Sequence, residues 1–195
     1  MQVEDPSPTD WLLFGLGNPG ERYRKTRHNL GWMLTEKLCE RHGGRWIPGR
    51  ADYFVARCTI EDRRLHLIRP TTFMNLSGRA VRAYLAIERP ERPELCVAID
   101  DVAIDLGRMK LRPKGSSGGH NGLRSIDETL RGQDYARLRM GCGPVPEGED
   151  MADYVLEEFL EDEWGQVDAL VERAADAAES WVLRGVQSTM GRFNG

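Results

Sequence analysis

Two spacings of apolar residues alternate along this chain, one typical of buried strands and one typical of amphipathic helices. Short apolar or alternating runs bounded by turn residues predict strands at 11–16, 53–60, 65–68, 95–99, 107–112 and 136–142. Helical spacing predicts helices at 29–41, 74–87, 153–163 and 166–186. A further helix is predicted to run from the end of a glycine-rich loop (115–122) to residue 130. Strands and helices interleave, so we expect an α/β fold: a single domain with a mixed β-sheet surrounded by α-helices.

No repeat and no linker divides the chain. Its 195 residues suffice for one sizeable core, and we expect one domain at 11–190 after a loose N-terminal segment at 1–10. That segment has no apolar stretch, so we do not expect a signal or transit peptide. No apolar run is long enough to span a bilayer. The four cysteines lack a C-x-x-C pair, which favours free buried thiols in a reducing, cytoplasmic setting over a zinc site or disulfides.

Charge is unevenly distributed. The overall net charge of −4 argues against a polyanionic partner. However, residues 1–146 carry 24 Lys and Arg against 18 Asp and Glu, whereas residues 147–195 carry 3 against 13. Such asymmetry indicates a basic surface that faces nucleic acid, although solvated acidic helix faces at the C-terminal end would produce the same numbers.

The stretch from residue 15 to 29, GLGNPGERYRKTRHN, directly follows the first predicted strand. Loops at strand ends are where α/β proteins place ligands. This loop carries four basic residues and His28, and a histidine with a pKa of about 6.5 suits proton transfer near neutral pH. Its first six residues match the dinucleotide pattern G-x-G-x-x-G, but a turn and a polar loop follow instead of a helix, so we do not expect nicotinamide binding.

A second motif, G-x-S-x-G at 115–119, is typical of serine hydrolases with a nucleophile elbow. That architecture needs an acid and a histidine after the serine, and the last histidine, His120, follows Ser117 by only three residues. A triad of His28, Asp100 and Ser117 stays open, because triads are defined by geometry and not by chain order. A flexible loop of small residues is the simpler interpretation.

Polar side chains gather just beyond the predicted elements in four segments: 18 with 28–29, 73–75, 100–101 and 119–122. If these segments converge, the site holds a histidine base, a carboxylate that orients it, and amides that bind water and stabilise an oxyanion. This set predicts ester hydrolysis by a histidine-activated water, without a metal or a covalent intermediate. Each residue alone is consistent with a turn or a helix cap. We assign structural roles to His42, in the last turn of a helix, and to His66, within a strand.

Several motifs carry a more specific signal: GLGNPG at 15–20, Tyr23, TRHN at 26–29, PTTFMNLSG at 70–78, GGHNGL at 118–123 and RLR at 137–139. In order and spacing they resemble the bacterial peptidyl-tRNA hydrolase family, and the resemblance covers residues 11–186. It implies a monomeric, cofactor-free, single-domain α/β enzyme. Such an enzyme cleaves the ester between a peptide and the 3′ ribose of tRNA, which frees tRNA from stalled translation.

The resemblance also implies roles for single residues. His28 matches the catalytic base, Asp100 the acid that stabilises and orients it, and Asn18 the residue that reads the blocked amino group of the substrate. The positions that match substrate-binding groups are Tyr23, Phe73 and Met74, as walls of the cleft, and Asn75 and Asn121, as amides that position water and substrate. The segment 146–162 resembles a mobile helix at the cleft mouth.

Three basic residues, Lys110, Arg112 and Arg139, match positions that face tRNA phosphates. Residues 105–140 carry 8 basic against 4 acidic side chains, and Arg112 and Arg139 lie on predicted strands that flank the glycine-rich loop. We therefore expect both arginines to point to one phosphate near the cleft, since a guanidinium binds two phosphate oxygens at once.

The chain departs from the family's pattern at two places. The segment 102–105 reads VAID where the family usually has Leu-Asp-Leu-Pro, and Pro144 follows Gly143 where the family usually has a basic residue before proline. Neither change removes a catalytic position, but both bear on tRNA contacts. A chloroplast branch of the family acts as a splicing factor without needing hydrolysis. A non-catalytic RNA-binding protein of the same fold is therefore the alternative.

Overall fold

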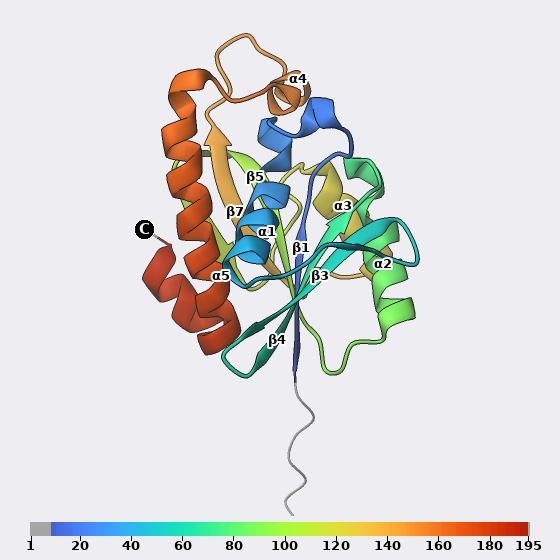
Figure 1. Ribbon diagram of the computed structural model, residues 1–195. Coiled ribbons are helices and arrows are strands. Elements are labelled where there is room, and N and C mark those ends of the chain that lie inside the picture. Colours follow the sequence, from blue (N-terminus) through green and yellow to red (C-terminus); the bar gives the residue numbers. More distant parts are fainter. Residues whose placement is uncertain (1–8, 195) are drawn as a thin grey trace, which may run out of the picture.

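A mixed seven-stranded sheet forms the centre of the computed structural model, which describes residues 9–194 (Figure 1). Its strands are β1 (Asp10–Gly15), β2 (Ile47–Pro48), β3 (Tyr53–Ile60), β4 (Arg63–Pro70), β5 (Glu94–Asp105), β6 (Met109–Arg112) and β7 (Ala136–Gly143), in the order β2-β3-β4-β1-β5-β7-β6. The central strands β4, β1, β5 and β7 run parallel, and β2, β3 and β6 pair antiparallel at the two edges. The carboxyl ends of the four parallel strands therefore meet at one edge of the sheet.

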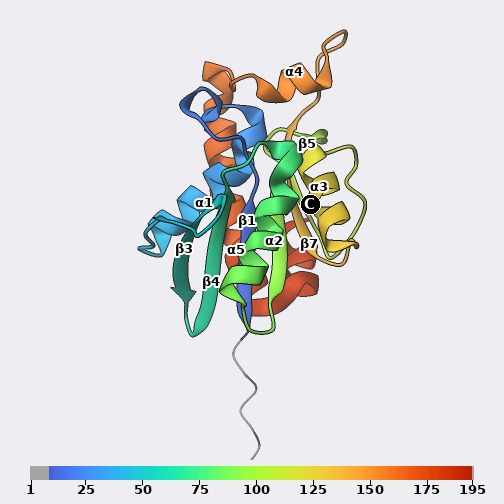
Figure 2. The same ribbon diagram turned by 90° about the vertical axis from the view of Figure 1, so that its right-hand side faces the viewer.

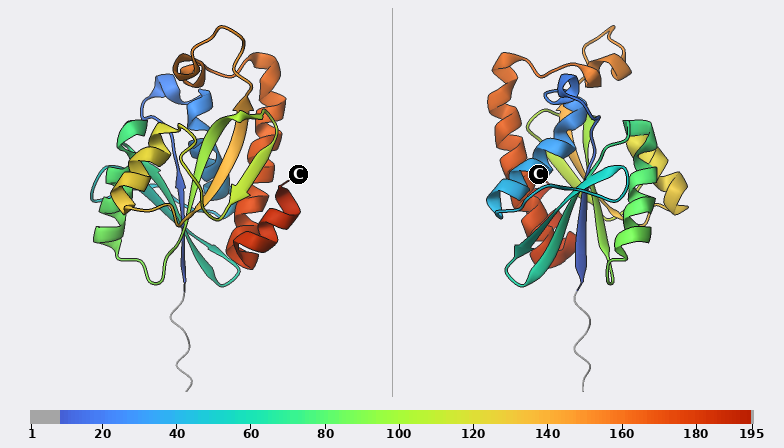
Figure 3. Two further views of the ribbon diagram at one scale, coloured as in Figure 1. Left: turned by 180° about the vertical axis from the view of Figure 1, so that it is seen from behind. Right: turned by 45° about the vertical axis from the view of Figure 1, so that its right-hand side comes forward.

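Helices cover both faces of this sheet. They are α1 (Leu30–Arg41), α2 (Ser77–Glu88), α3 (Asn121–Leu130), α4 (Met151–Leu156) and α5 (Trp164–Phe193). Helices α1 and α5 pack on one face and α2 and α3 on the other (Figures 2 and 3). A hydrophobic core lies on each face of the sheet, and successive side chains of β1 point alternately into one and the other. Leu13 belongs to the core under α1 and α5, whereas Leu12 and Phe14 belong to the core under α2 and α3. Short α4 lies apart, above the loop that follows β1 (Figure 1).

The predicted α/β class and the mixed sheet are confirmed. Strand 53–60 has the predicted bounds, and the other five predicted strands and the helices at 29–41, 74–87 and 166–186 are present with shifted ends. Strand β5 extends beyond the predicted 95–99, and the two-residue β2 was not predicted. The N-terminal segment predicted at 1–10 lies outside the described residues except for 9 and 10, and Asp10 is the buried first residue of β1.

The helix predicted at 153–163 is wrong. Helix α4 ends at Leu156, Glu157 is extended, and a 3-10 turn at Glu161–Glu163 precedes α5. The backbone between them pairs with the loop after β1, since Arg27 N donates to Glu157 O (3.1 Å) and Phe159 N donates to Lys25 O (3.3 Å). This tertiary pairing overrides the local helix propensity.

Two further expectations concern the whole chain. All four cysteines are buried free thiols, as predicted. Among residues 9–194, no helix combines the length and the apolar character needed to cross a membrane.

Candidate active site

A cleft of about 430 Å³ opens where the parallel strands end. The four polar segments identified in the sequence meet there. The loop after β1 contributes Asn18, Tyr23 and His28, the turn after β4 contributes residues 73–75, β5 contributes Asp100 and Asp101, and the glycine-rich loop contributes residues 118–121. The remaining wall consists of Val102, Arg139, Met151, Ala152, Val155 and Leu156. Charged and amide groups thus face apolar side chains of α4 across one cavity.

The local fold fixes the position of His28 in the lining of this cleft. It lies in a 3-10 turn, Arg27–Asn29, immediately before α1. The Asn29 side chain clamps the backbone of Asn18, accepting from its N–H (2.8 Å) and donating to its carbonyl (3.0 Å). Gly31 lets α1 start directly against the sheet, because a Cβ there would lie 2.4 Å from the Ala98 carbonyl oxygen. The base is therefore positioned by backbone contacts on both sides.

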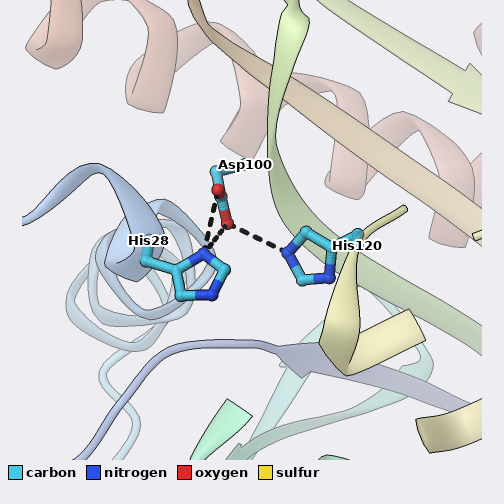
Figure 4. Close-up of side chains that lie close together, drawn as sticks. All are labelled: His28, Asp100 and His120. Atoms are coloured by element: carbon cyan, nitrogen blue, oxygen red, sulfur yellow. Dashed lines mark hydrogen bonds and ion pairs between the residues drawn. The ribbon is translucent and has the colours of Figure 1, made fainter. Parts of the chain in front are cut away.

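Asp100 orients the His28 imidazole (Figure 4). The His28 Nδ1 atom lies 2.9 Å from Oδ1 and 3.0 Å from Oδ2 of this buried carboxylate. With Nδ1–H donating to Asp100, the lone pair lies on Nε2, which has no hydrogen-bond partner among the described residues. Since the imidazole lines the cleft, its free nitrogen is available to a bound water or substrate.

The two partners shift each other's pKa in opposite directions. Burial alone would lower the pKa of His28, but the charge of Asp100 and its hydrogen bond outweigh burial and raise it. Burial alone would raise the pKa of Asp100, but the imidazoles of His28 and His120 hold it well below its usual range. The carboxylate stays ionised at neutral pH and stabilises a proton on His28.

His120 is a second imidazole on the same carboxylate (Figure 4). Its Nε2 lies 3.1 Å from Asp100 Oδ1, while its Nδ1 caps α3 by accepting from the backbone N–H groups of Gly122 (3.2 Å) and Leu123 (3.3 Å). The sequence predicts only His28 on this carboxylate and does not predict the contact of His120. The position of His120 just before an apolar helix signals a cap, but nothing in the sequence brings it to Asp100.

The residues His28, Asp100 and His120 are types that bind metals, and their ligand atoms lie within 4.8 Å of one another. The hydrogen bonds of His120 oppose such binding. Its Nδ1 lone pair is engaged by two backbone N–H groups, so the ring proton lies on Nε2, the atom that would have to bind the metal. This donor set favours an orienting role for His120 over metal ligation.

The side-chain amide of Asn18 has its oxygen engaged and its nitrogen left for the cleft. Its Oδ1 accepts from the backbone N–H of Met74 (2.9 Å), so the Nδ2 donors are the atoms left for a ligand. Asn121 is similarly constrained, because its Oδ1 accepts from Arg124 Nη2 (2.7 Å). Both amides are thereby prepared to donate to a carbonyl or to an oxyanion.

The remaining predicted substrate-binding residues differ in exposure. Met74 is buried, Tyr23 is half-buried, and Phe73 and Asn75 are exposed at the cleft. Two exposed side chains of α4, Met151 and Leu156, line the same cavity. An apolar portion of a ligand can therefore be covered from two sides while its polar centre meets the amides and His28.

Comparison with known proteins identifies the family. The family model described as peptidyl-tRNA hydrolase matches residues 12–195. The chain belongs to the peptidyl-tRNA hydrolase family. Peptidyl-tRNA hydrolases of Chloroflexus aggregans and Methylacidiphilum infernorum are 44% and 40% identical to it, over 94% of this chain and 98% and 97% of theirs.

Solved structures agree with this family. The crystal structure of peptidyl-tRNA hydrolase from Acinetobacter baumannii superimposes with a TM-score of 0.86 at 31% identity, over 94% of each chain. A 5′-methylthioadenosine nucleosidase of Arabidopsis thaliana has a TM-score of 0.55 at 9% identity, which is a likeness of fold alone. The expected membership of the family is therefore confirmed by sequence and by structure.

Of the three basic positions carried over from the family, only Arg139 lines the cleft. Its guanidinium is already engaged, with Nη1 on Asp101 Oδ2 (3.0 Å) and Nη2 on the Ser116 carbonyl (2.7 Å). The strand register places Lys110 opposite Arg139, and Arg112 opposite Arg137. Because β6 runs antiparallel, Arg112 lies two residues further from the cleft than Lys110 does. A phosphate beside Arg139 would therefore meet Lys110 before Arg112.

Two motif alternatives are not favoured. Ser117 is not among the cleft-lining residues, and its backbone carbonyl accepts from His120 N (3.2 Å). The glycines at 15–20 lead into a 3-10 turn, Glu21–Tyr23, and α1 begins only at Leu30, so they do not sit at a helix N-terminus as a dinucleotide fingerprint does. Membership of the peptidyl-tRNA hydrolase family accounts for both glycine-rich loops without either chemistry.

Proposed function

We propose that this protein hydrolyses the ester between the peptide and the 3′ ribose of peptidyl-tRNA, and so releases tRNA from stalled translation. The observation that carries this proposal is the His28 imidazole, fixed through Nδ1 by buried Asp100 and free at Nε2 in a cleft of amides. The family relatives are named for this substrate. We expect the protein to act as a monomer in the cytoplasm, where peptidyl-tRNA is found.

The chemistry needs one water and no cofactor. Nε2 of His28 accepts a proton from the water as its oxygen bonds to the ester carbonyl carbon. The Asp100 carboxylate stabilises the imidazolium that forms. As the tetrahedral intermediate collapses, the C–O bond to the ribose breaks, and the proton from His28 passes to the 3′ oxygen. The products are a peptide with a free carboxyl group and tRNA with a free 3′ hydroxyl.

Negative charge that develops on the carbonyl oxygen needs hydrogen-bond donors. The Nδ2 groups of Asn18 and Asn121 line the cleft with their oxygens engaged elsewhere, and Asn75 is exposed in the same cavity. Removing a single donor of this kind typically costs about 10²- to 10³-fold in kcat. We assign these amides to substrate carbonyls and to the oxyanion.

The site must distinguish peptidyl-tRNA from aminoacyl-tRNA, which carries a protonated amine where the peptide has an amide. With Oδ1 of Asn18 fixed by Met74 N, the cleft meets Nδ2, which donates to an acyl carbonyl and cannot accept from an ammonium group. We assign to Asn18 the rejection of free aminoacyl-tRNA.

The test is to compare deacylation of N-acetylated and free aminoacyl-tRNA. The wild type should cleave the acetylated substrate much faster. Asn18→Asp places a second carboxylate oxygen toward the cleft and should narrow this preference, whereas Asn18→Ala should slow the acetylated substrate without accelerating the free one. Equal preference in wild type and Asn18→Asp would remove Asn18 from this role. No deacylation by the wild type would instead favour the non-catalytic RNA-binding alternative.

Contacts with the tRNA backbone belong to the same proposal. Lys110 and Arg112 are exposed on one face of β6, and Arg139 lies beside Lys110 at the cleft. Cross-strand neighbours of this kind lie close enough to share one phosphate. We assign Lys110 and Arg139 to the end of the acceptor stem nearest the ester, and Arg112 to a phosphate further along.

A further inference from the structure

Arg27 precedes the base His28 in the chain but does not line the cleft. Its side chain is buried, and within residues 9–194 the polar partners of its guanidinium all lie in the segment that follows β7. Nη1 donates to the carbonyls of Tyr154 (3.4 Å) and Glu158 (3.0 Å), and Nη2 donates to Glu163 Oε2 (3.2 Å). The same group lies over the Tyr154 ring, 4.1 Å from its centroid. One side chain thus joins the turn of the base to α4.

Helix α4 needs such an anchor. It has six residues, too few to be stable as an isolated helix in water. Among the residues of α4, Tyr154 is the one that is buried, and its hydroxyl donates to the Cys142 carbonyl (2.8 Å). Other side chains of α4 line the cleft, namely Met151, Ala152, Val155 and Leu156. The contacts of Arg27 with Tyr154 and of Tyr154 with Cys142 therefore fix the position of this apolar wall.

We propose that Arg27 is a positioning residue that holds α4 as the apolar wall beside His28, so that this wall binds the acyl portion of the substrate next to the base. The proposal rests on the function proposed above. An acyl side chain packed between α4 and exposed Phe73 places its ester near Nε2 of His28. Without the anchor, the base and the amides remain in place, but the acyl portion loses one of its two walls.

The chemistry of the anchor requires arginine. A planar guanidinium donates to several carbonyl and carboxylate oxygens in one plane while its face lies on an aromatic ring. Here these partners are Tyr154, Glu158 and Glu163, with Phe159 as a second ring at 5.3 Å. The ammonium group of lysine has neither several donors in one plane nor a planar surface that stacks on a ring, so lysine should not restore the anchor.

The test uses two N-acetylated aminoacyl-tRNAs, one with glycine and one with phenylalanine. In Arg27→Gln and Arg27→Lys, we expect KM for the phenylalanine substrate to rise about tenfold and KM for the glycine substrate to change much less. The acid midpoint of the pH profile should stay unchanged, because the His28–Asp100 pair is intact. Amide exchange within residues 151–160 should accelerate. The control is Arg24→Gln, since Arg24 is exposed and its salt bridge is to Glu21, outside the segment that follows β7.

A second variant keeps the proposal testable if Arg27 variants fold poorly. Leu156→Ser alters the exposed wall without touching the anchor, and it should reproduce the same split in KM between the two substrates. Equal loss on both substrates, or an unchanged exchange rate in 151–160 for Arg27→Gln, would overturn the proposal. If the wild type cleaves neither substrate, the proposed function fails, while amide exchange still reports whether Arg27 holds α4.

Discussion

His28 and His66 each lie near a buried aspartate, but the two pairs differ in geometry. His28 Nδ1 lies 2.9 Å from Asp100, whereas His66 Nε2 lies 3.8 Å from Asp10 and its Nδ1 lies 2.6 Å from the Tyr84 hydroxyl. Both nitrogens of His66 therefore face protein groups, and this residue is not among those that line the cleft. Of these two histidines, His28 is the one that combines an orienting carboxylate with a nitrogen left for a ligand.

The electrostatic consequences of the two arrangements are opposite. Burial lowers the pKa of both histidines. At His28 the close carboxylate outweighs burial and the pKa rises. At His66 the pKa falls, because Asp10 is too distant to offset burial and the charges of Arg57 and Arg64 act in the same direction as burial. A nearby carboxylate does not by itself raise the pKa of a histidine, because hydrogen-bond geometry and neighbouring cations decide the direction of the shift.

The largest effect should come from removing the base. We expect His28→Ala to lower the turnover of N-acetylated aminoacyl-tRNA by about 10²- to 10⁴-fold, because the water loses its proton acceptor. Binding of tRNA and the melting temperature should change little. The matched variant His66→Gln should keep the turnover of the wild type. Single-turnover rates and thermal melting are measured for the wild type, His28→Ala and His66→Gln. A His28→Ala protein that keeps its turnover would contradict the mechanism.

A smaller effect separates the groups that bind tRNA from those that support the chemistry. We expect Lys110→Ala to raise KM for full-length substrate, to reduce the slope of log K against log salt by about 0.9, and to spare a short peptidyl-nucleotide fragment that lacks the stem. Arg139→Ala should impair the fragment as well, because Arg139 also ties Ser116 and Asp101 beside the loop that carries His120. Equal losses on both substrates for Lys110→Ala would contradict its assignment to a phosphate.

The smallest effect concerns stability. The raised pKa of His28 means that the folded state binds more protons above pH 6.5, so this residue's contribution to stability falls as pH rises through its folded pKa. The lowered pKa of His66 means that the unfolded state binds more protons just below pH 6.5, so stability rises with pH in that window. His28→Asn should remove the first slope and His66→Gln the second. Urea unfolding at several pH values measures both, and slopes of the same sign would contradict the comparison.

The sequence predicts the convergence of the site better than its internal contacts. Apolar runs located the parallel strands, and side chains just beyond their carboxyl ends necessarily share one edge of the sheet. From the sequence this convergence is a condition, and the structure meets it, with Asn18, His28 and Asp100 lining one cleft. The sequence does not predict His120 on Asp100, because that contact depends on how the glycine-rich loop folds back.

Segments that pair with distant backbone are the ones that local patterns misread. The helix predicted at 153–163 fails because Glu157 and Phe159 pair with the loop around Arg27, more than a hundred residues earlier. Likewise, the strand register places Lys110, and not Arg112, opposite Arg139, and periodicity does not specify the register of two strands that are separated by a loop and a helix. Both features depend on contacts between elements that are not neighbours in the sequence.

The acid limb of the pH profile tests the central claim, that neutral His28 held by Asp100 is the base. We measure kcat/KM for N-acetylated aminoacyl-tRNA from pH 5 to 8 in wild type and Asp100→Asn. The wild-type rate should fall as pH drops, with a midpoint above the ordinary histidine pKa of about 6.5. In Asp100→Asn the maximum should be lower and the midpoint should move below 6.5, because burial then acts without the carboxylate. The same midpoint in both proteins would contradict the account.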